Sequence, residues 1–197
     1  MLSIQGNRVS LIRVFVGSAE KFRVCEEPLR RSVQENTKSQ FSITFMRPET
    51  LGIPETGCTG FSNLRFLVPE LAGHSGFAIY LDVDMLLLGD IAELWAHRTP
   101  GQWVALQDGS TEVSVIDCEV DYGLPAYEDI ANFKIWEVLE TLRTANKIGA
   151  EWNSEDRITP GAKLLHFTDL KQQPWFFKHQ DKTATAIWDY YSGNKTN

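Results

Sequence analysis

Cysteine is scarce in this sequence, and its pattern is not that of a disulfide framework or a zinc site. Cys25, Cys58 and Cys118 are odd in number, lie far apart and include no C-x-x-C pair. Buried apolar side chains are the simpler interpretation of such cysteines. Since nothing indicates an oxidising compartment, we expect a reduced, cytoplasmic protein.

Long apolar runs are absent as well. The first ten residues are mixed in character, and the apolar stretch over residues 11–16 is interrupted by Arg13. That stretch has the length of a strand and lacks the features of a secretory signal. Nothing approaches the roughly 18–20 apolar residues of a membrane-spanning helix. We therefore expect neither a signal peptide nor a transmembrane segment.

Positive charge is outnumbered by negative charge. The chain has 19 Lys and Arg against 26 Asp and Glu, a net charge of −7. General binding to nucleic acids or to anionic membranes draws on exposed basic surface, so this balance argues against both. An anionic small ligand is not excluded, because a metal ion or a few local cations can override the net charge.

What is present is an ordinary globular composition. Over 197 residues, 43% are hydrophobic and 23% are charged, which suffices for one domain with a sizeable core. No internal repeat or low-complexity stretch interrupts the chain. We expect a single domain over residues 1–197 with an aromatic C-terminal tail from about residue 176, and a homo-oligomer is left open.

Strand-like and helix-like segments alternate along the chain. Apolar or alternating runs predict strands over residues 11–17, 41–45, 76–81, 103–106, 114–117 and 162–167. Helical spacing predicts helices over residues 21–36, 61–71, 91–95 and 132–146. Pro28 either starts the first helix near Glu26 or kinks it. The alternation predicts an α/β fold with a mostly parallel central sheet flanked by helices, in which ligands bind beyond the carboxyl ends of the strands.

Two aspartates follow one of the buried strands. Asp82 and Asp84 flank Val83 directly after FAIYL. In an extended chain both carboxylates would point to the same side, and Val83 would point into the protein. Two carboxylates with few other ligands suit Mg²⁺ or Mn²⁺ shared with a phosphate-bearing substrate. A turn with two solvated aspartates is the simpler alternative, which the apolar runs on both sides make less favourable.

A histidine at the end of another predicted strand is a second candidate ligand. His166 stands in KLLHF, and imidazole is a competent ligand for Mn²⁺. A lone histidine beside apolar residues is more often a core side chain, and the sequence alone cannot bring His166 to Asp82. Both interpretations stay open on the residues themselves.

Four segments, in the same order, resemble glycosyltransferase family 8. IYLDVDMLLLGDIAELW (79–95) is similar to the metal-binding segment of that family, and TGFSNLRFLVPEL (59–71) to the helix that precedes it. SVIDCE (114–119) is similar to the strand that lines the donor sugar, and KLLHFTDLKQQPW (163–175) to a segment that ends in proline and tryptophan. The family comprises retaining sugar transferases of the GT-A fold, a nucleotide-diphospho-sugar transferase fold, and includes glycogenin-type and galactosyltransferase-type members.

This resemblance implies a metal site and a donor site. Asp82 and Asp84 would bind Mn²⁺ (or Mg²⁺) that bridges the diphosphate of a UDP-sugar, with His166 as the third protein ligand. The same resemblance implies that Arg65 and Lys171, together with Val83 between the aspartates, contact the donor.

Three further carboxylates near predicted strand ends, Asp108, Glu112 and Asp117, are candidates for facing the sugar, although none is singled out as a nucleophile. The implied activity is metal-dependent transfer of a hexosyl unit from a UDP-sugar to a hydroxyl group of a carbohydrate or glycoconjugate acceptor. No nucleic-acid partner is implied.

The match to the family is incomplete. Residues 112–114 lack the asparagine-x-glycine that many relatives have near the donor-sugar strand, and the first strand ends at Gly17 instead of an aspartate. Asp169 also stands where glycine is usual. A non-catalytic sugar-nucleotide-binding protein of the same fold therefore stays open. A D-x-D phosphatase is less favoured, because Leu86 stands where that class has threonine.

Overall fold

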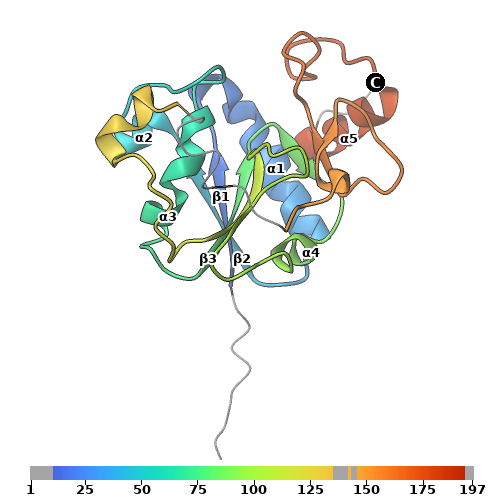
Figure 1. Cartoon of the computed structure of the whole chain (residues 1–197). Helices are drawn as coiled ribbons and strands as arrows, with labels where there is room; N and C mark the ends of the chain where they lie inside the picture. The colour runs from blue at the N-terminus through green and yellow to red at the C-terminus, as the bar shows by residue number, and fades with distance from the viewer. Residues whose placement is uncertain (1–10, 135–141, 143–145, 194–197) are drawn as a thin grey trace, which may run out of the picture.

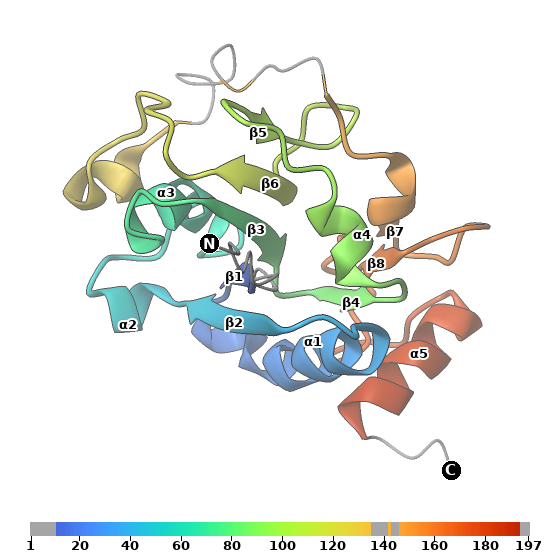
Figure 2. The same ribbon diagram turned by 90° about the horizontal axis from the view of Figure 1, so that it is seen from below.

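The computed structural model describes residues 11–134, 142 and 146–193. Its larger sheet has five strands in the order β2-β1-β3-β6-β5 (Figure 1 and Figure 2). The strands are β1 (Ile12–Gly17), β2 (Phe41–Met46), β3 (Phe77–Asp82), β5 (Trp103–Val104) and β6 (Val113–Asp117). Because β1, β2 and β3 are parallel and β5 and β6 pair antiparallel, only β6 runs against the other four. The expected α/β fold with a mostly parallel central sheet is confirmed.

A second, smaller sheet lies beside the first and has the order β4-β8-β7 (Figure 2). Its strands are β4 (Met85–Leu87), β7 (Ser154–Glu155) and β8 (Leu164–His166). Strand β4 follows β3 after a turn of two residues, Val83 and Asp84. The chain therefore passes from the larger sheet into the smaller one at the D-x-D segment.

Helices cover the sheets and share one hydrophobic core with them. Helix α1 packs against β4 and against α5 (Figure 1). The α-helices are α1 (Arg23–Asn36), α2 (Pro48–Leu51), α3 (Val68–Leu71), α4 (Ile91–Trp95) and α5 (Lys182–Ser192). The 3-10 turns are η1 (Glu20–Phe22), η2 (Ser62–Leu67), η3 (Tyr127–Asn132) and η5 (Ala150–Trp152). Within the described ranges, no helix is both long enough and apolar enough to cross a membrane.

Pro28 neither starts nor ends the first helix, which begins at Arg23. A proline inside a helix removes the hydrogen bond to the carbonyl four residues earlier. Here that carbonyl belongs to Val24, an exposed residue in the first turn of α1. The lost bond therefore falls at the helix end, where it is tolerated best.

The helix expected over residues 61–71 is divided into η2 and α3. Pro69 has no N–H to donate to the carbonyl of Arg65, and the N–H of Val68 binds that carbonyl in a 3-10 pattern instead. Proline is accepted in the first turn of α3, where the N–H would have no helical partner. One predicted helix thus becomes a 3-10 turn followed by a short α-helix.

Of two further segments, one is shorter than predicted and the other lies largely outside the described residues. Strand β5 is shorter than residues 103–106, because the chain then turns so that Leu106 bridges to Ile148. The helix expected over residues 132–146 falls largely outside the described residues, and Asn132 ends the 3-10 turn η3.

The C-terminal segment is attached to the core through aromatic side chains. The ring of Trp175 lies 5.8 Å from Phe167 and 5.0 Å from Trp188, between centroids. Phe167 directly follows β8, and Trp188 lies on α5. Trp152 is fully buried. The interpretation of Trp152 and Trp175 as packing residues is therefore favoured over exposed platforms for sugars.

We predict that Asp181→Ala destabilises the protein by about 1 kcal/mol, because Asp181 is the N-cap of α5. Its carboxylate accepts hydrogen bonds from the backbone N–H groups of Ala184 and Thr183, which lower its pKa. This stabilisation is present above the unfolded pKa of about 3.9 and is lost as the pH falls through the lower folded pKa.

Urea denaturation of Asp181→Ala and Asp181→Asn at neutral pH would measure the contribution of this cap. Asparagine is as good an N-cap as aspartate, so Asp181→Asn should unfold close to the wild type. Equal destabilisation by both substitutions would contradict the capping role.

Candidate metal centre

Strand register brings the ends of three segments to one edge of the larger sheet. Gly17, the last residue of β1, pairs with Asp82, the last residue of β3. Strand β6 is antiparallel to β3, and Leu81 pairs with its first residue, Val113. Glu112, just before β6, is therefore delivered to the same edge as Asp82.

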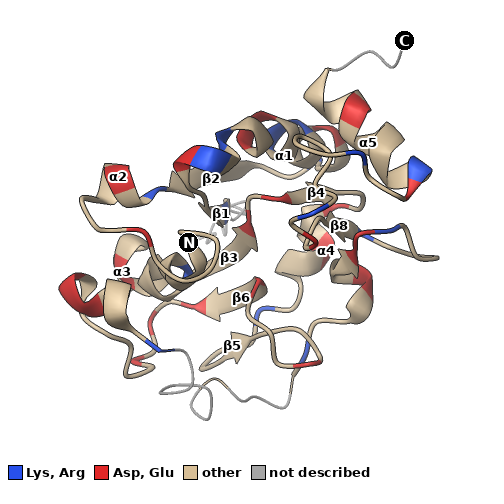
Figure 3. Ribbon diagram, turned by 90° about the horizontal axis from the view of Figure 1, so that it is seen from above, with Lys and Arg blue, Asp and Glu red and all other residues tan. Residues whose placement is uncertain are grey.

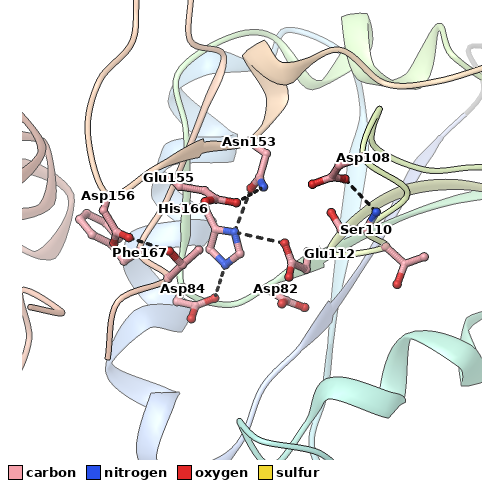
Figure 4. Close-up of polar contacts among 12 residues, drawn as sticks. Asp82, Asp84, Asp108, Ser110, Glu112, Asn153, Glu155, Asp156, His166 and Phe167 are labelled. Atoms are coloured by element: carbon pink, nitrogen blue, oxygen red, sulfur yellow. Dashed lines mark hydrogen bonds and ion pairs between the residues drawn. The ribbon is translucent and has the colours of Figure 1, made fainter. Parts of the chain in front are cut away.

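The smaller sheet brings the histidine to the two aspartates. His166 pairs with Met85, the residue after Asp84, and Phe167 donates its N–H to the carbonyl of Asp84 at 3.0 Å. One ligand atom from each of Asp82, Asp84 and His166 lies within 4.8 Å of the others (Figure 4). All three residues are buried, with exposed fractions of 3–5%. His166 is thus a buried side chain that lies beside the two carboxylates, as a shared metal site would require.

The two aspartates do not lie on one extended strand. Asp82 ends β3, and Val83 and Asp84 form a turn. The side chain of Val83 is fully buried, as expected, and its N–H donates to the carbonyl of Gly17 at 3.1 Å. The turn, instead of strand alternation, therefore directs the second carboxylate to the site.

Asp82 is held by a cation and a hydroxyl group. Nη2 of Arg65 lies 3.1 Å and 3.2 Å from its two carboxylate oxygens, and the hydroxyl of Tyr80 donates to Oδ1 at 2.6 Å. Burial raises the pKa of Asp82, and the positive charge of Arg65 opposes that rise. Arg65 itself is 7% exposed and also donates to Ser62 and Thr111. In this structure Arg65 acts on the site by orienting Asp82.

Asp84 and His166 form a looser pair. Nε2 of His166 lies 3.3 Å from Oδ1 of Asp84, but this buried oxygen accepts no well-aligned hydrogen bond. Burial lowers the pKa of His166, whereas the charges of Asp84, Asp82 and Glu112 raise it, with the net result of about 9. The protonated, charged form of His166 is therefore favoured, and the buried Oδ1 of Asp84 faces it without a well-aligned hydrogen bond.

Asn153 orients the histidine ring from the other side. Its Oδ1 lies 2.9 Å from Nδ1 of His166, so that Nδ1 donates a proton and Nε2 is directed at Asp84. Asn153 was not among the residues predicted from the sequence. It precedes the two-residue strand β7, whose Glu155 pairs with His166, and so short a strand gives no sequence signal.

This donor set fits a divalent metal ion. Two carboxylates and one imidazole are ligands that Mn²⁺ accepts, and the unpartnered Oδ1 of Asp84 is the kind of buried atom that a bound cation would satisfy. Mg²⁺ is compatible with the carboxylates but prefers oxygen to imidazole. Asp82, Asp84 and His166 are therefore the residues of this chain that could hold such an ion.

Of the candidate carboxylates, Glu112 lies beside this group, and Asp108 lies farther from it (Figure 4). Oε2 of Glu112 lies 3.8 Å from Nδ1 of His166, and burial raises the pKa of Glu112. Asp108 is exposed and accepts a hydrogen bond from the N–H of Ser110 (Figure 4). Lys171 is exposed on the loop after β8, and its contact with a donor remains a prediction.

Asp117 is not brought to the group. It pairs with Phe77, the first residue of β3, so it lies at the opposite end of that strand from Asp82, roughly 16 Å away along the strand. Its carboxylate accepts hydrogen bonds from the N–H groups of Gly101 and Glu119. These hydrogen bonds give Asp117 a structural role at that end of the sheet.

The glycine at the end of β1, Gly17, has a local structural reason. A Cβ atom there would overlap the hydroxyl of Tyr80 and press on the ring of Phe61. That hydroxyl is the one that donates to Asp82. The glycine thus makes room for a group that holds the first carboxylate.

The chain matches no protein-family model and no curated protein sequence, but solved structures are similar to it. The glycosyltransferase GlyE of Streptococcus pneumoniae TIGR4 superimposes with a TM-score of 0.65 at 13% identity, covering 93% of this chain and 60% of GlyE. An active-site mutant of LgtC gives 0.64 at 11% identity, covering 94% and 97% of the two chains. The chain has the GT-A fold. Mouse xyloside xylosyltransferase 1 agrees more distantly, with a TM-score of 0.53 at 10% identity.

The expected GT-A fold is thus confirmed by structures that share little sequence with this chain. The chain spans 60% of the length of GlyE. Within this GT-A fold, the Asp82, Asp84 and His166 group lies where β3 leaves the larger sheet, at the carboxyl end of a parallel strand. That edge is where ligands bind in open α/β sheets.

We predict that Arg65→Met destabilises the protein by about 3–5 kcal/mol, because it leaves the buried carboxylate of Asp82 without its cation. The matched control is Arg23→Met, which removes an exposed arginine from a surface ion pair and should change the urea midpoint little. Adding Asp82→Asn to Arg65→Met should restore part of the loss, since no unpaired charge then remains. Equal effects of Arg65→Met and Arg23→Met would contradict this account.

For Asn153 we predict a role in metal affinity. Asn153→Ala should weaken Mn²⁺ binding about 10–100-fold, because the histidine ring loses the acceptor that orients it. Asn153→Asp keeps an acceptor at this position and should bind Mn²⁺ more tightly than Asn153→Ala. Calorimetric titration with Mn²⁺ would measure both, with Asn146→Ala as a control away from the site. Unchanged affinity in Asn153→Ala would disprove the orienting role.

Proposed function

We propose that this protein is a glycosyltransferase that moves a hexosyl unit from a UDP-sugar to an acceptor hydroxyl group. The observation that carries the proposal is the buried group of Asp82, Asp84 and His166 at the ligand-binding edge of a GT-A fold. LgtC, one of the similar structures, is a galactosyltransferase solved with donor and acceptor sugar analogues. The acceptor sugar analogue bound by LgtC supports our proposal of a carbohydrate or glycoconjugate acceptor.

The metal would be held by Asp82, Asp84 and His166. When bound, it would supply positive charge to the diphosphate leaving group as the glycosidic bond breaks. Arg65 and Tyr80 favour the charged form of Asp82 and fix its orientation, so that the site needs little rearrangement during the reaction. The burial of the three ligands excludes water and strengthens every charge interaction among them.

Net transfer requires the acceptor hydroxyl to lose a proton and the sugar carbon C1 to exchange its phosphate oxygen for the acceptor oxygen. Glu112 is the carboxylate of this chain best placed to take a part in these steps, because it is near the group and its raised pKa suits proton exchange. Retention of configuration at C1 is part of the proposal. Comparing the anomeric configuration of product and donor by NMR would test it.

Asp84→Asn should abolish metal-dependent donor hydrolysis and lower UDP affinity in Mn²⁺, because the substitution removes one ligand charge without changing the shape of the side chain. Titration with UDP and several UDP-sugars, in Mn²⁺ and in chelator, measures the binding. Asp121→Asn, at an exposed position far from the group, is the matched control and should behave as wild type.

The result of the same assays separates this proposal from a non-catalytic sugar-nucleotide-binding protein. Wild-type protein that binds UDP-sugars with metal but never hydrolyses or transfers any of them would favour that alternative. UDP affinity that is equal in Mn²⁺ and in chelator would contradict the metal site. Release of phosphate from a phosphomonoester without UDP affinity would contradict the proposal as a whole.

A further inference from the structure

A cavity of about 220 Å³ adjoins the metal centre. It is lined by Leu106, Gln107, Asp108, Ala150, Asn153 and Glu155. Pockets for drug-sized ligands usually measure about 300–1,000 Å³, so this cavity suits a single sugar ring better than an oligosaccharide.

Asn153 connects the cavity to the metal centre. Its Oδ1 faces the ring of His166, and its Nδ2 donates to Oε1 of Glu155 at 3.1 Å. Figure 4 shows Asn153 and Glu155 on one side of an open space and Asp108 on the other, with Glu112 between them. A sugar attached to a diphosphate at the metal centre would therefore meet this space first.

Two of the four polar side chains that line this cavity are the carboxylates of Asp108 and Glu155, and the other two are the amides of Gln107 and Asn153. Asp108 accepts one hydrogen bond from Ser110 and Glu155 one from Asn153, which leaves carboxylate oxygens available to sugar hydroxyl groups. Neither Lys nor Arg is among the residues that line the cavity. In Figure 3 acidic residues are spread over helices and loops, and two of them, Asp108 and Glu155, line this cavity.

We propose that this cavity receives the sugar ring of the donor and selects neutral, hydroxyl-bearing sugars over uronic acids. This inference rests on the proposed function. A carboxylate on the sugar would be placed beside Asp108 and Glu155, the two carboxylates that line the cavity, and like charges at this range repel. The hydroxymethyl group of a neutral hexose would instead donate a hydrogen bond to one of the same oxygens.

The experiment compares sugars that differ only at C6. UDP, UDP-glucose, UDP-galactose, UDP-glucuronic acid and UDP-galacturonic acid are titrated calorimetrically into the wild-type protein with Mn²⁺. Each acidic donor should bind about two- to fivefold more weakly than its neutral counterpart, as expected for partly exposed charges. The difference should shrink when NaCl is raised toward 1 M, because the screening length falls from about 10 Å at 0.1 M to about 3 Å.

Variants identify the residues responsible. The double substitution Asp108→Asn with Glu155→Gln keeps the shapes of both side chains and should reduce the preference for neutral sugars by at least half. Glu128→Gln makes the same kind of charge change on the exposed turn η3 and should leave the preference unchanged.

Three negative results have different meanings. If UDP binds but acidic and neutral donors bind equally at low salt, this inference is overturned while the proposed function stands. If neither UDP nor any UDP-sugar binds in Mn²⁺, the proposed function is overturned and the inference with it. A preference that persists unchanged at high salt would also overturn the electrostatic selection proposed here.

Discussion

The structure depends most on how it accommodates two buried carboxylates at the point where β3 ends. Isolated charges in a protein interior are strongly unfavourable, and a buried ion pair is favourable only with good geometry and further hydrogen bonds. Asp82 meets this condition through Arg65 and Tyr80. Asp84 meets it only in part, through His166. Asp82 thus has full partners and Asp84 does not, and this difference makes the end of β3 a candidate metal site.

The need to stabilise these two carboxylates explains several of the residues around them. Arg65 is buried because its charge is needed at Asp82, and Gly17 leaves room for the hydroxyl of Tyr80. His166 is delivered by a three-residue strand in the smaller sheet, which has few hydrogen bonds of its own. The aromatic contacts of Phe167 with the C-terminal segment compensate for this short strand. Packing of the C-terminal segment on Phe167 therefore helps to fix the neighbouring His166.

The net negative charge of the chain bears on how the proposed donor would bind. A net charge of −7 would oppose the approach of the proposed anionic donor, so the proposal requires positive charge at the site itself. Arg65 is already engaged by Asp82, so a metal ion and Lys171 are the proposed sources of positive charge for a diphosphate. The cavity beside Asn153 contains carboxylates instead, which is why we propose it for the sugar half of the donor.

The sequence by itself determined the fold class and most of the elements, because apolar periodicity depends only on local spacing and on burial. It also indicated Asp82 and Asp84, because two carboxylates between two apolar runs are uncommon unless they have a role. Only the tertiary structure decided that His166 and Asn153 join them and that Asp117 does not, because these depend on strand pairings between residues far apart in the chain. The tertiary structure also decided what each proline does. Pro28 is tolerated inside α1 because the carbonyl that loses its hydrogen bond lies in the first turn, whereas Pro69 divides the expected helix into η2 and α3.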